Sequence, residues 1–387
     1  MNAVTKSKAA AIAKAELADG GLQVAWTEDW PPSRFEYFWL RDHGEDENSL
    51  DPKTRQRRVD TFAIPAGLRA TAAEIEDGGQ RLRLHWSDGG PPSLHSAGQL
   101  AALAGLTPGD EAMAPGLAPR PWAEGKMPES LPGVDYDVVM AGEAGLRAWL
   151  EAIHVWGFAL VTGVPGTEEA TRALARRIGP IRETIFGGLW TLSSEVKEHD
   201  DTAYSTLFLG PHTDATYSHD APGLQMFNCL QFDGEGGESI LVDGLAIAEN
   251  LRAERPEDFE ILTRIKVPGQ YIEPGVHLRA ERPPIRLDAR GKFLQITVNN
   301  YDRAPFRLPE AEMAAFYRAY GELHRRINER ANWLSIPLRP GNTLIFDNWR
   351  TLHGRMAYLG KRVFCGCYHN REDFESRLRV ASSSAET

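Results

Sequence analysis

The alternation of apolar and polar residues along the chain predicts a β-rich protein with a few helices. Three segments in the first hundred residues have the composition of short strands: 22–30, 35–40 and 80–88. From about residue 204 onward, further strand segments follow: AYSTLFLG, LQMFNCL, SILVDG, LQITVNN, NTLIFDN and RVFCGCYH. Residues 246–264 and 309–330 instead space their apolar positions with a helical period. Many short strands with Gly and Pro turns predict a mainly β fold with helices, either a β-sandwich or a jelly-roll barrel.

A stretch rich in Pro and Gly divides the chain into two predicted domains. Residues 105–133 contain no apolar period, which is typical of a linker. We therefore predict a small β-rich N-terminal domain over 1–110, a linker over 111–133, and a jelly-roll domain over 134–387. The length of 387 residues also favours two domains. The Ala- and Lys-rich start, MNAVTKSKAAAIAKAELADGG, is compatible with an amphipathic helix.

Charge and composition exclude several classes of partner. The net charge of −11 argues against nucleic acid, because phosphate binding needs clustered Lys and Arg, and the basic run at 55–58 follows an acidic one. Apolar runs such as 157–164 are shorter than the about 20 residues that span a bilayer, so we expect no membrane segment. Three cysteines and a start without a secretory apolar core favour the cytoplasm: Cys229, Cys365 and Cys367.

The decapeptide PHTDATYSHD supplies the first candidate metal ligands. His212 and Asp214 point to the same side of an extended chain, because side chains alternate with a period of two. Similar His-x-acid patterns occur at 199–201 and 43–45, but both lie in polar loops. Only the pair at 212 and 214 follows an apolar strand, YSTLFLG, and it is therefore the better candidate.

A histidine and an arginine near the C-terminus complete a candidate iron site. His353 follows an apolar strand and the polar run DNWR, and Arg362 comes nine residues later. Two imidazoles and one carboxylate suit Fe(II) and leave coordination positions open. The Arg362 guanidinium can pair with the distal carboxylate of 2-oxoglutarate, and Ser239 is placed to assist it. Without His353, the favoured interpretation of Arg362 would be a surface ion pair.

Several stretches together resemble one enzyme family. The region from about 180 to 380 contains FGGLW, DTAYSTLFLGPHTDATY, GGESILVDG, VNNYDRA, FDNWRTLHGR and CGCY. It is similar to the γ-butyrobetaine hydroxylase and trimethyllysine dioxygenase branch of the taurine dioxygenase-like superfamily. The first hundred residues, with FWLRDHGEDENSLDPKTRQRR, look like the β-rich N-terminal domain of these enzymes. The resemblance implies a homodimeric Fe(II)- and 2-oxoglutarate-dependent dioxygenase on a double-stranded β-helix (jelly-roll) core. Such an enzyme consumes O2, releases succinate and CO2, and hydroxylates an unactivated C–H bond.

One departure from this family changes the expected metal content. Many members carry a zinc site built from a cysteine cluster just after the WLRD motif. The same place here, residues 43–48, has the sequence HGEDEN and contains no cysteine. We therefore predict no structural zinc, and we expect His43 and His85 to be core or surface histidines.

The resemblance also implies a site for a trimethylammonium group. Such a group cannot donate ordinary hydrogen bonds, so enzymes enclose it in aromatic faces through cation–π attraction. By motif position, the aromatic cage would consist of Phe186, Trp190, Tyr204 and Tyr368. The alternative interpretation is that these four side chains are only core aromatics.

The far end of the substrate leaves more than one possibility. Asp201 occupies the place where γ-butyrobetaine hydroxylases have an amide residue facing the substrate carboxylate. A carboxylate there favours an ammonium group, and hence trimethyllysine over γ-butyrobetaine. Asn299, Asn300 and Arg303 are candidates to bind the acidic group, or they form only a turn between strands. The alternatives are a small sulfonate, a phosphonate such as (2-trimethylaminoethyl)phosphonate, and a non-catalytic jelly-roll binding protein.

Overall fold

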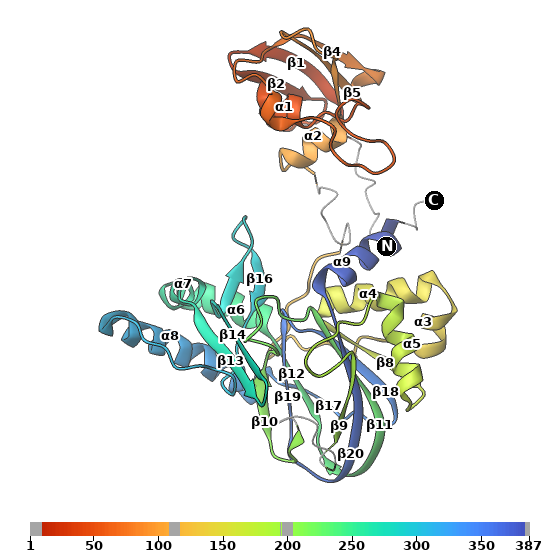
Figure 1. Ribbon diagram of the computed structural model, residues 1–387, viewed down its shortest axis with the longest axis vertical. Coiled ribbons are helices and arrows are strands. Elements are labelled where there is room, and N and C mark those ends of the chain that lie inside the picture. The colour runs from red at the N-terminus through yellow and green to blue at the C-terminus, as the bar shows by residue number, and fades with distance from the viewer. Residues whose placement is uncertain (1–9, 108–116, 194, 196–203, 384–387) are drawn as a thin grey trace. The chain divides into compact units, whose positions relative to one another are not determined.

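The chain divides into two compact units, which are described separately. The computed structural model describes residues 10–107, 117–193, 195 and 204–383 (Figure 1). The N-terminal unit comprises Met1–Ala112 and the C-terminal unit comprises Met113–Thr387.

The N-terminal unit consists of two three-stranded antiparallel sheets around one core. The first sheet has the order β1 (Ile12–Ala18), β2 (Gly21–Trp26), β3 (Ser33–Glu36), and the second has the order β4 (Ala70–Glu76), β5 (Arg81–Trp86), β6 (Ser93–Ser96). Two short helices, α1 (Tyr37–Asp42) and α2 (Ala97–Leu103), follow β3 and β6, and 3-10 turns lie at Thr61–Ala63 and Asp77–Gly79. Alternate residues of β2 and β5 are buried in the shared core: Leu22, Val24, Trp26, Leu82, Leu84 and Trp86.

The structure of this unit differs from the sequence analysis at two places. The start of the chain is compatible with an amphipathic helix by composition, but β1 is a strand that pairs with β2 across a tight turn, in which Gly20 has a φ of 73°. The strand expected at 35–40 is instead the end of β3 followed by helix α1. Tyr37 and Leu40 are the buried residues of α1, and their spacing of three places both on one helical face.

Two sheets form the centre of the C-terminal unit. The six-stranded sheet has the order β7 (Gly133–Asp135), β8 (Phe158–Val164), β18 (Gly341–Asp347), β11 (Leu224–Gly236), β20 (Tyr358–His369), β9 (Leu189–Ser193). The four-stranded sheet has the order β10 (Leu209–His212), β19 (Thr351–Arg355), β12 (Ser239–Asp243), β17 (Leu334–Ile336). Two hairpins are formed by β13 (Val267–Glu273) with β14 (Val276–Arg282) and by β15 (Ile285–Leu287) with β16 (Phe293–Ile296). Within both main sheets, β7 and β8 are the one parallel pair of the described strands.

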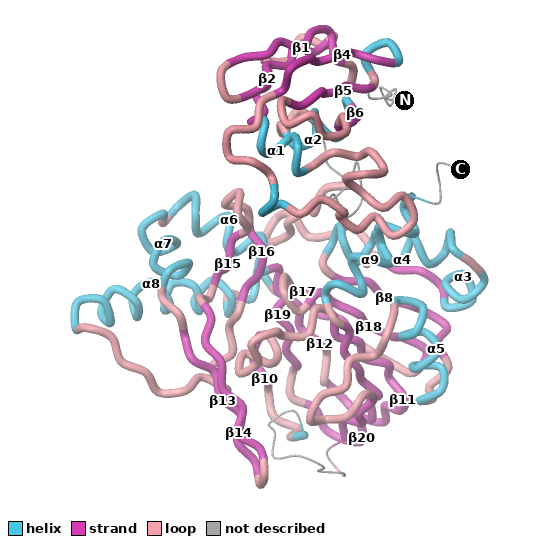
Figure 2. Tube along the Cα trace, turned by 45° about the horizontal axis from the view of Figure 1, so that its top comes forward, coloured by secondary structure: helices cyan, strands magenta, loops and turns pink. Residues whose placement is uncertain are grey.

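Helices cover the outer faces of both sheets (Figure 2). The six-stranded sheet is covered by α3 (Tyr136–Ala141), α4 (Glu143–Trp156), α5 (Glu168–Ile178) and α9 (Arg371–Ser383). The four-stranded sheet is covered by α6 (Gly244–Glu254), α7 (Pro256–Arg264) and α8 (Glu310–Asn328), and a 3-10 turn follows at Arg330–Asn332. The predicted helix 246–264 is divided at Arg255, because Pro256 lacks the N–H that would continue the first helix. No helix in the described residues is long and apolar enough to cross a membrane.

Successive side chains of β11 point to opposite faces of its sheet, one toward the covering helices and one toward the space between the two sheets. Leu224 and Met226 pack beneath the helices, whereas Gln225 and Phe227 line the space between the sheets. The inner faces of the sheets meet in a shared apolar cluster that includes Phe158, Phe346, Phe364, Leu241 and Ile336. The interior of this sandwich therefore combines a packed apolar cluster with a pocket that both aromatic and polar side chains line.

The segment predicted as a linker, 111–133, is largely part of the C-terminal unit. Residues 108–116 lie outside the described residues, but Trp122 is fully buried in the inner apolar cluster. Its indole Nε1 donates to the carbonyl of Trp156 at 2.8 Å, and its backbone N–H donates to Asp243 at 3.0 Å. The Pro and Gly content indicated irregular backbone, whereas the buried indole attaches that backbone to the sandwich.

Candidate active site

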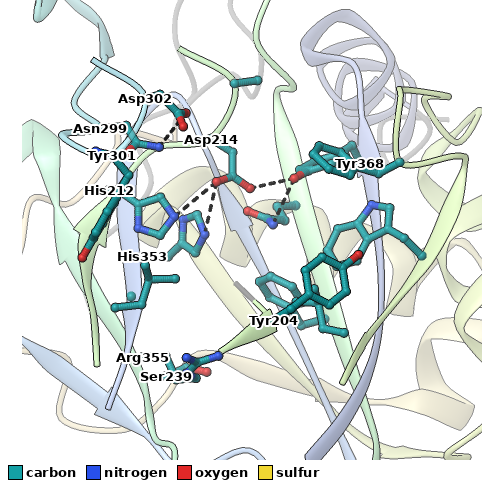
Figure 3. A pocket seen from close by; sticks show the side chains of 18 of the residues that line it. Tyr204, His212, Asp214, Ser239, Asn299, Tyr301, Asp302, His353, Arg355 and Tyr368 are labelled. Atoms are coloured by element: carbon teal, nitrogen blue, oxygen red, sulfur yellow. Dashed lines mark hydrogen bonds and ion pairs between the residues drawn. The ribbon is translucent and has the colours of Figure 1, made fainter. Parts of the chain in front are cut away.

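Neighbouring strands of the four-stranded sheet bring the predicted iron ligands together. His212 at the end of β10 pairs in register with His353 of β19, and Asp214 follows β10 by two residues. One ligand atom from each of these three residues lies within 4.8 Å of the others (Figure 3). In the part of the chain that the structure describes, no other three or more His, Cys, Asp and Glu side chains gather this way. Strand pairing thus brings together residues that are far apart in sequence.

Hydrogen bonding orients the His212 ring for metal binding. The Nδ1 atom of His212 lies 2.8 Å from the carbonyl oxygen of Gly210, which can only accept, so Nδ1 carries the proton. Nε2 is then left with its lone pair. The Nε2 atoms of His212 and His353 lie 3.3 and 3.7 Å from the same Asp214 oxygen, Oδ1. Three donor atoms therefore face one another, as binding to a single cation requires.

The surroundings of Asp214 and His353 favour the protonation states of metal ligands. Burial raises the pKa of Asp214, but His353, His212 and the Tyr368 hydroxyl outweigh burial and lower it overall. Burial, together with neighbouring His212, lowers the pKa of His353 to about 3, so this ring is neutral near pH 7. Burial also lowers the pKa of His212, but Asp214 outweighs it and raises that pKa overall. A proton and a metal ion compete for Nε2 of His212, so metal affinity should weaken in acid.

The same pocket contains the residues predicted to anchor 2-oxoglutarate. Arg362 of β20 and Ser239 of β12 both line it, and both are buried. The Arg362 guanidinium lies 3.7 Å from the ring centroid of Phe364 and forms no ion pair with any described residue. Burial, assisted by nearby Arg355, lowers the pKa of Arg362 to about 10. A buried cation without a carboxylate is costly, so the pocket is suited to an anionic ligand.

All four predicted cage residues line this pocket. Trp190 and Tyr204 are buried, and the rings of Trp190 and Tyr368 lie 5.4 Å apart at 49°. Phe186 packs edge-on against Tyr271, with ring centroids 5.7 Å apart. These side chains come from β9, β20 and the loops beside them, and they form an aromatic wall next to the candidate metal ligands.

A glycine makes room for the Trp190 ring. Gly366 lies opposite Trp190 in the pairing of β20 with β9. A Cβ atom at Gly366 would lie 2.0 Å from two carbon atoms of the indole ring, which is inside van der Waals contact. The glycine of the CGCY motif is therefore required for the Trp190 ring to pack against β20. The two cysteines of the motif, Cys365 and Cys367, are buried and form no disulfide.

The residues predicted for the far end of the substrate are not all at the pocket. Asp201 lies outside the described residues, and Asn300 is exposed and does not line the pocket. Its neighbour Asn299 does line it, and its Nδ2 donates to Asp302 at 2.8 Å. Arg303 instead lies over the rings of two tyrosines of α8. Because residues 297–303 form no regular strand, the sequence could not show which side chains face inward.

Sequence reasoning missed several lining residues. Asp302 adds a second carboxylate to the pocket, and Tyr301 lines it beside His212. Arg355 also lines the pocket, and it donates to the carbonyls of Ser205 and Leu207 at 2.6 and 2.7 Å. The period of two in β19 could have identified Arg355, because it lies two residues after His353 on the same face.

The fold and the site define a class of enzyme. Two imidazoles and one carboxylate with an adjoining open pocket form the ligand set of non-haem iron(II) oxygenases. Residues 119–368 match the family model described as Taurine catabolism dioxygenase TauD, TfdA family. The chain belongs to this family.

Curated relatives cover nearly the whole chain. Trimethyllysine dioxygenase of Meyerozyma guilliermondii is 34% identical over 95% of this chain and 95% of its own. The mitochondrial trimethyllysine dioxygenase of Rattus norvegicus is 34% identical over 90% of this chain and 82% of its own. Gamma-butyrobetaine dioxygenase of Pseudomonas sp. (strain AK-1) is 34% identical over 95% of this chain and 96% of its own. A solved taurine dioxygenase from Burkholderia xenovorans overlaps 66% of this chain and 91% of its own at 15% identity and a TM-score of 0.47.

The family match and the curated relatives confirm the family and the enzyme class inferred from the motifs. The chain is an iron(II)- and 2-oxoglutarate-dependent dioxygenase, and its His212, Asp214 and His353 fit the iron by donor chemistry, spacing and burial.

Proposed function

We propose that this enzyme hydroxylates an unactivated C–H bond of a small trimethylammonium compound, and that trimethyllysine is favoured over γ-butyrobetaine. The observation that carries the proposal is the aromatic wall around Trp190 and Tyr368, directly beside Asp214. Aromatic faces attract a quaternary ammonium group that can donate no ordinary hydrogen bond. The names of the relatives, which include both trimethyllysine and γ-butyrobetaine dioxygenases, support this substrate class.

Each end of the pocket has a proposed role. Iron would be held by His212, Asp214 and His353, and the distal carboxylate of 2-oxoglutarate by Arg362 with Ser239, on a double-stranded β-helix core. When bound, iron and 2-oxoglutarate supply the oxidising chemistry, which consumes O2 and releases succinate and CO2. The surrounding side chains hold the substrate C–H bond near the metal and exclude water.

The preference for trimethyllysine rests on a carboxylate in the pocket. Asp302 attracts a substrate ammonium group and repels the terminal carboxylate of γ-butyrobetaine. Asn299, which is hydrogen-bonded to Asp302, offers a polar partner for the far end of the substrate. A cytoplasmic location and a homodimeric assembly remain predictions of the sequence and of the family resemblance.

A succinate-formation screen tests the substrate class. Trimethyllysine, γ-butyrobetaine, (2-trimethylaminoethyl)phosphonate and unmethylated lysine would be compared side by side at equal concentration. Trimethyllysine should give the fastest succinate release, and lysine should give only the rate seen without substrate. Equal rates for lysine and trimethyllysine would contradict a cation cage.

Substitution of Arg362 tests the 2-oxoglutarate anchor. Arg362→Met should raise the KM for 2-oxoglutarate by about 100-fold, because the variant removes the buried partner of a carboxylate. Arg339→Met is a matched control, since Arg339 also lies over a phenylalanine ring, at 4.0 Å, but does not line the pocket. A KM that rises equally in both variants would show that Arg362 has no specific role.

A further inference from the structure

We infer that Tyr368 is a positioning residue for the iron ligand Asp214, and that Gln225 orients Tyr368 in turn. The role of the Tyr368 ring in the cation cage rests on the proposed function, whereas the role of its hydroxyl group does not. It gives one side chain two separable tasks, one through its hydroxyl group and one through its ring.

A continuous chain of hydrogen bonds connects the three residues. The Tyr368 hydroxyl donates to Oδ2 of Asp214 at 2.7 Å, and Nε2 of Gln225 donates to the Tyr368 oxygen at 3.4 Å (Figure 3). Gln225 and Tyr368 are directly paired residues of β11 and β20, so the sheet fixes their separation. These hydrogen bonds therefore connect the six-stranded sheet to the proposed iron ligand Asp214, which follows a strand of the four-stranded sheet.

The donors and acceptors on the three side chains fix the direction of these hydrogen bonds. A carboxylate that binds a metal ion can only accept, so the single phenolic proton of Tyr368 is donated to Asp214. The phenolic oxygen is then left with lone pairs, and the Gln225 amide must present its NH2 group. In this orientation the Gln225 Oε1 is buried and has no hydrogen-bond partner among the described residues.

The two oxygens of Asp214 have different surroundings. Oδ1 faces Nε2 of both histidines, whereas Oδ2 accepts the proton of Tyr368. The backbone N–H of Asp214 donates to the side-chain oxygen of Asn348 at 2.8 Å. With its backbone and Oδ2 both fixed, Asp214 can turn only Oδ1 toward the histidines. Partners of this kind are typically worth about 10- to 100-fold in metal affinity or activity.

The ring of Tyr368 faces the aromatic pocket at the same time. Its centroid lies 5.4 Å from that of Trp190, whose ring also packs edge-on against Phe227. Removal of the hydroxyl alone should therefore affect the metal, and removal of the Trp190 ring should affect the cation. The two variants separate the tasks.

The test is a Co(II) titration of the metal-free full-length enzyme, without 2-oxoglutarate or substrate. Tyr368→Phe should weaken Co(II) binding by about 10-fold or more and alter the visible Co(II) spectrum. Its kcat should fall, while its KM for trimethyllysine should change by less than about 3-fold, because the ring remains. Trp190→Leu should show the opposite pattern, with normal Co(II) affinity and a KM raised by about 10-fold.

Wild-type Co(II) affinity in Tyr368→Phe would overturn the inference, and so would identical profiles for the two variants. If Tyr368→Phe does not fold, Gln225→Met keeps the phenol and should weaken Co(II) binding by about 3-fold, and unchanged binding would overturn the inference. Because the titration contains no organic substrate, its result stands apart from the substrate screen. A failed screen with weakened Co(II) binding would contradict only the proposed substrate.

Discussion

Both units bury a histidine beside an aspartate, but only the C-terminal unit arranges them to bind a metal. In the N-terminal unit, Asp46 accepts hydrogen bonds from the backbone N–H groups of Asn48, Ser49 and Leu94 and from the Ser49 hydroxyl. His95 is buried nearby, with no hydrogen-bond partner for either ring nitrogen among the described residues. Asp46 therefore serves to fix a loop.

In the C-terminal unit, Asp214 directs one oxygen toward two imidazole nitrogens instead of toward N–H donors. The comparison shows that proximity of His and Asp does not make a metal site. The carboxylate must face other atoms that carry lone pairs, and those atoms must be held by rigid neighbours. Strand pairing holds His212 and His353, and Tyr368 holds the carboxylate.

The largest expected effect separates the two histidines. His353→Ala should reduce succinate formation to the level measured without enzyme, because iron loses one of its three proposed protein ligands. His95→Gln should retain wild-type turnover, because His95 belongs to the N-terminal unit and none of its atoms lines the pocket. The comparison would fail if His353→Ala remained active or if His95→Gln were inactive while folded.

A smaller effect is expected on the pH dependence of stability. Burial, opposed by Asp46 and assisted by His43, lowers the pKa of His95 from 6.5 to about 4. As the pH falls below 6.5, His95 binds a proton in the unfolded chain, whereas in the folded chain it stays neutral until about pH 4. The stabilisation is therefore complete above pH 6.5 and is lost toward pH 4, by roughly 3 kcal/mol in all.

Urea unfolding of the wild type and of His95→Gln, compared across this pH range, measures that contribution. The variant should lose less stability in acid than the wild type. Parallel pH profiles would show that His95 is not the buried neutral group described here.

The smallest effects concern one glycine in each unit. Gly366→Ala should displace the Trp190 ring and raise the KM for trimethyllysine by about 10-fold, since the new Cβ would lie 2.0 Å from the ring. Gly44→Ala places a Cβ 2.7 Å from the Ser49 hydroxyl and 2.8 Å from Asp46. It should lower the free energy of unfolding by about 1–2 kcal/mol and leave that KM unchanged. Steady-state kinetics and urea unfolding of both variants would show whether the two effects separate. A wild-type KM in Gly366→Ala would contradict the proposed place of Trp190 in the cage.

The elements of the C-terminal unit were largely predictable because alternation records which face of a strand is buried. His212, Asp214 and His353 could be chosen because each follows or lies in an apolar strand. The pairing of β10 with β19 could not be predicted, since register between distant strands leaves no mark in a single sequence.

Other features depend on contacts that composition does not reveal. The Pro- and Gly-rich segment around Trp122 has a linker composition, yet one buried indole attaches it to the sandwich. Asn300 and Asn299 are adjacent and chemically identical, and only the irregular backbone decides that Asn299 faces the pocket. The absence of cysteine at 43–48 still predicts that the N-terminal unit contains no structural zinc.

The most direct test is a metal count after dialysis against Fe(II) without oxygen. Wild type, His353→Ala and His95→Gln would be analysed for iron and zinc per chain. We expect a single iron in the wild type and in His95→Gln, no iron in His353→Ala, and no zinc in any of them. Iron retained by His353→Ala, or lost from His95→Gln, would contradict the assignment of the metal to His212, Asp214 and His353.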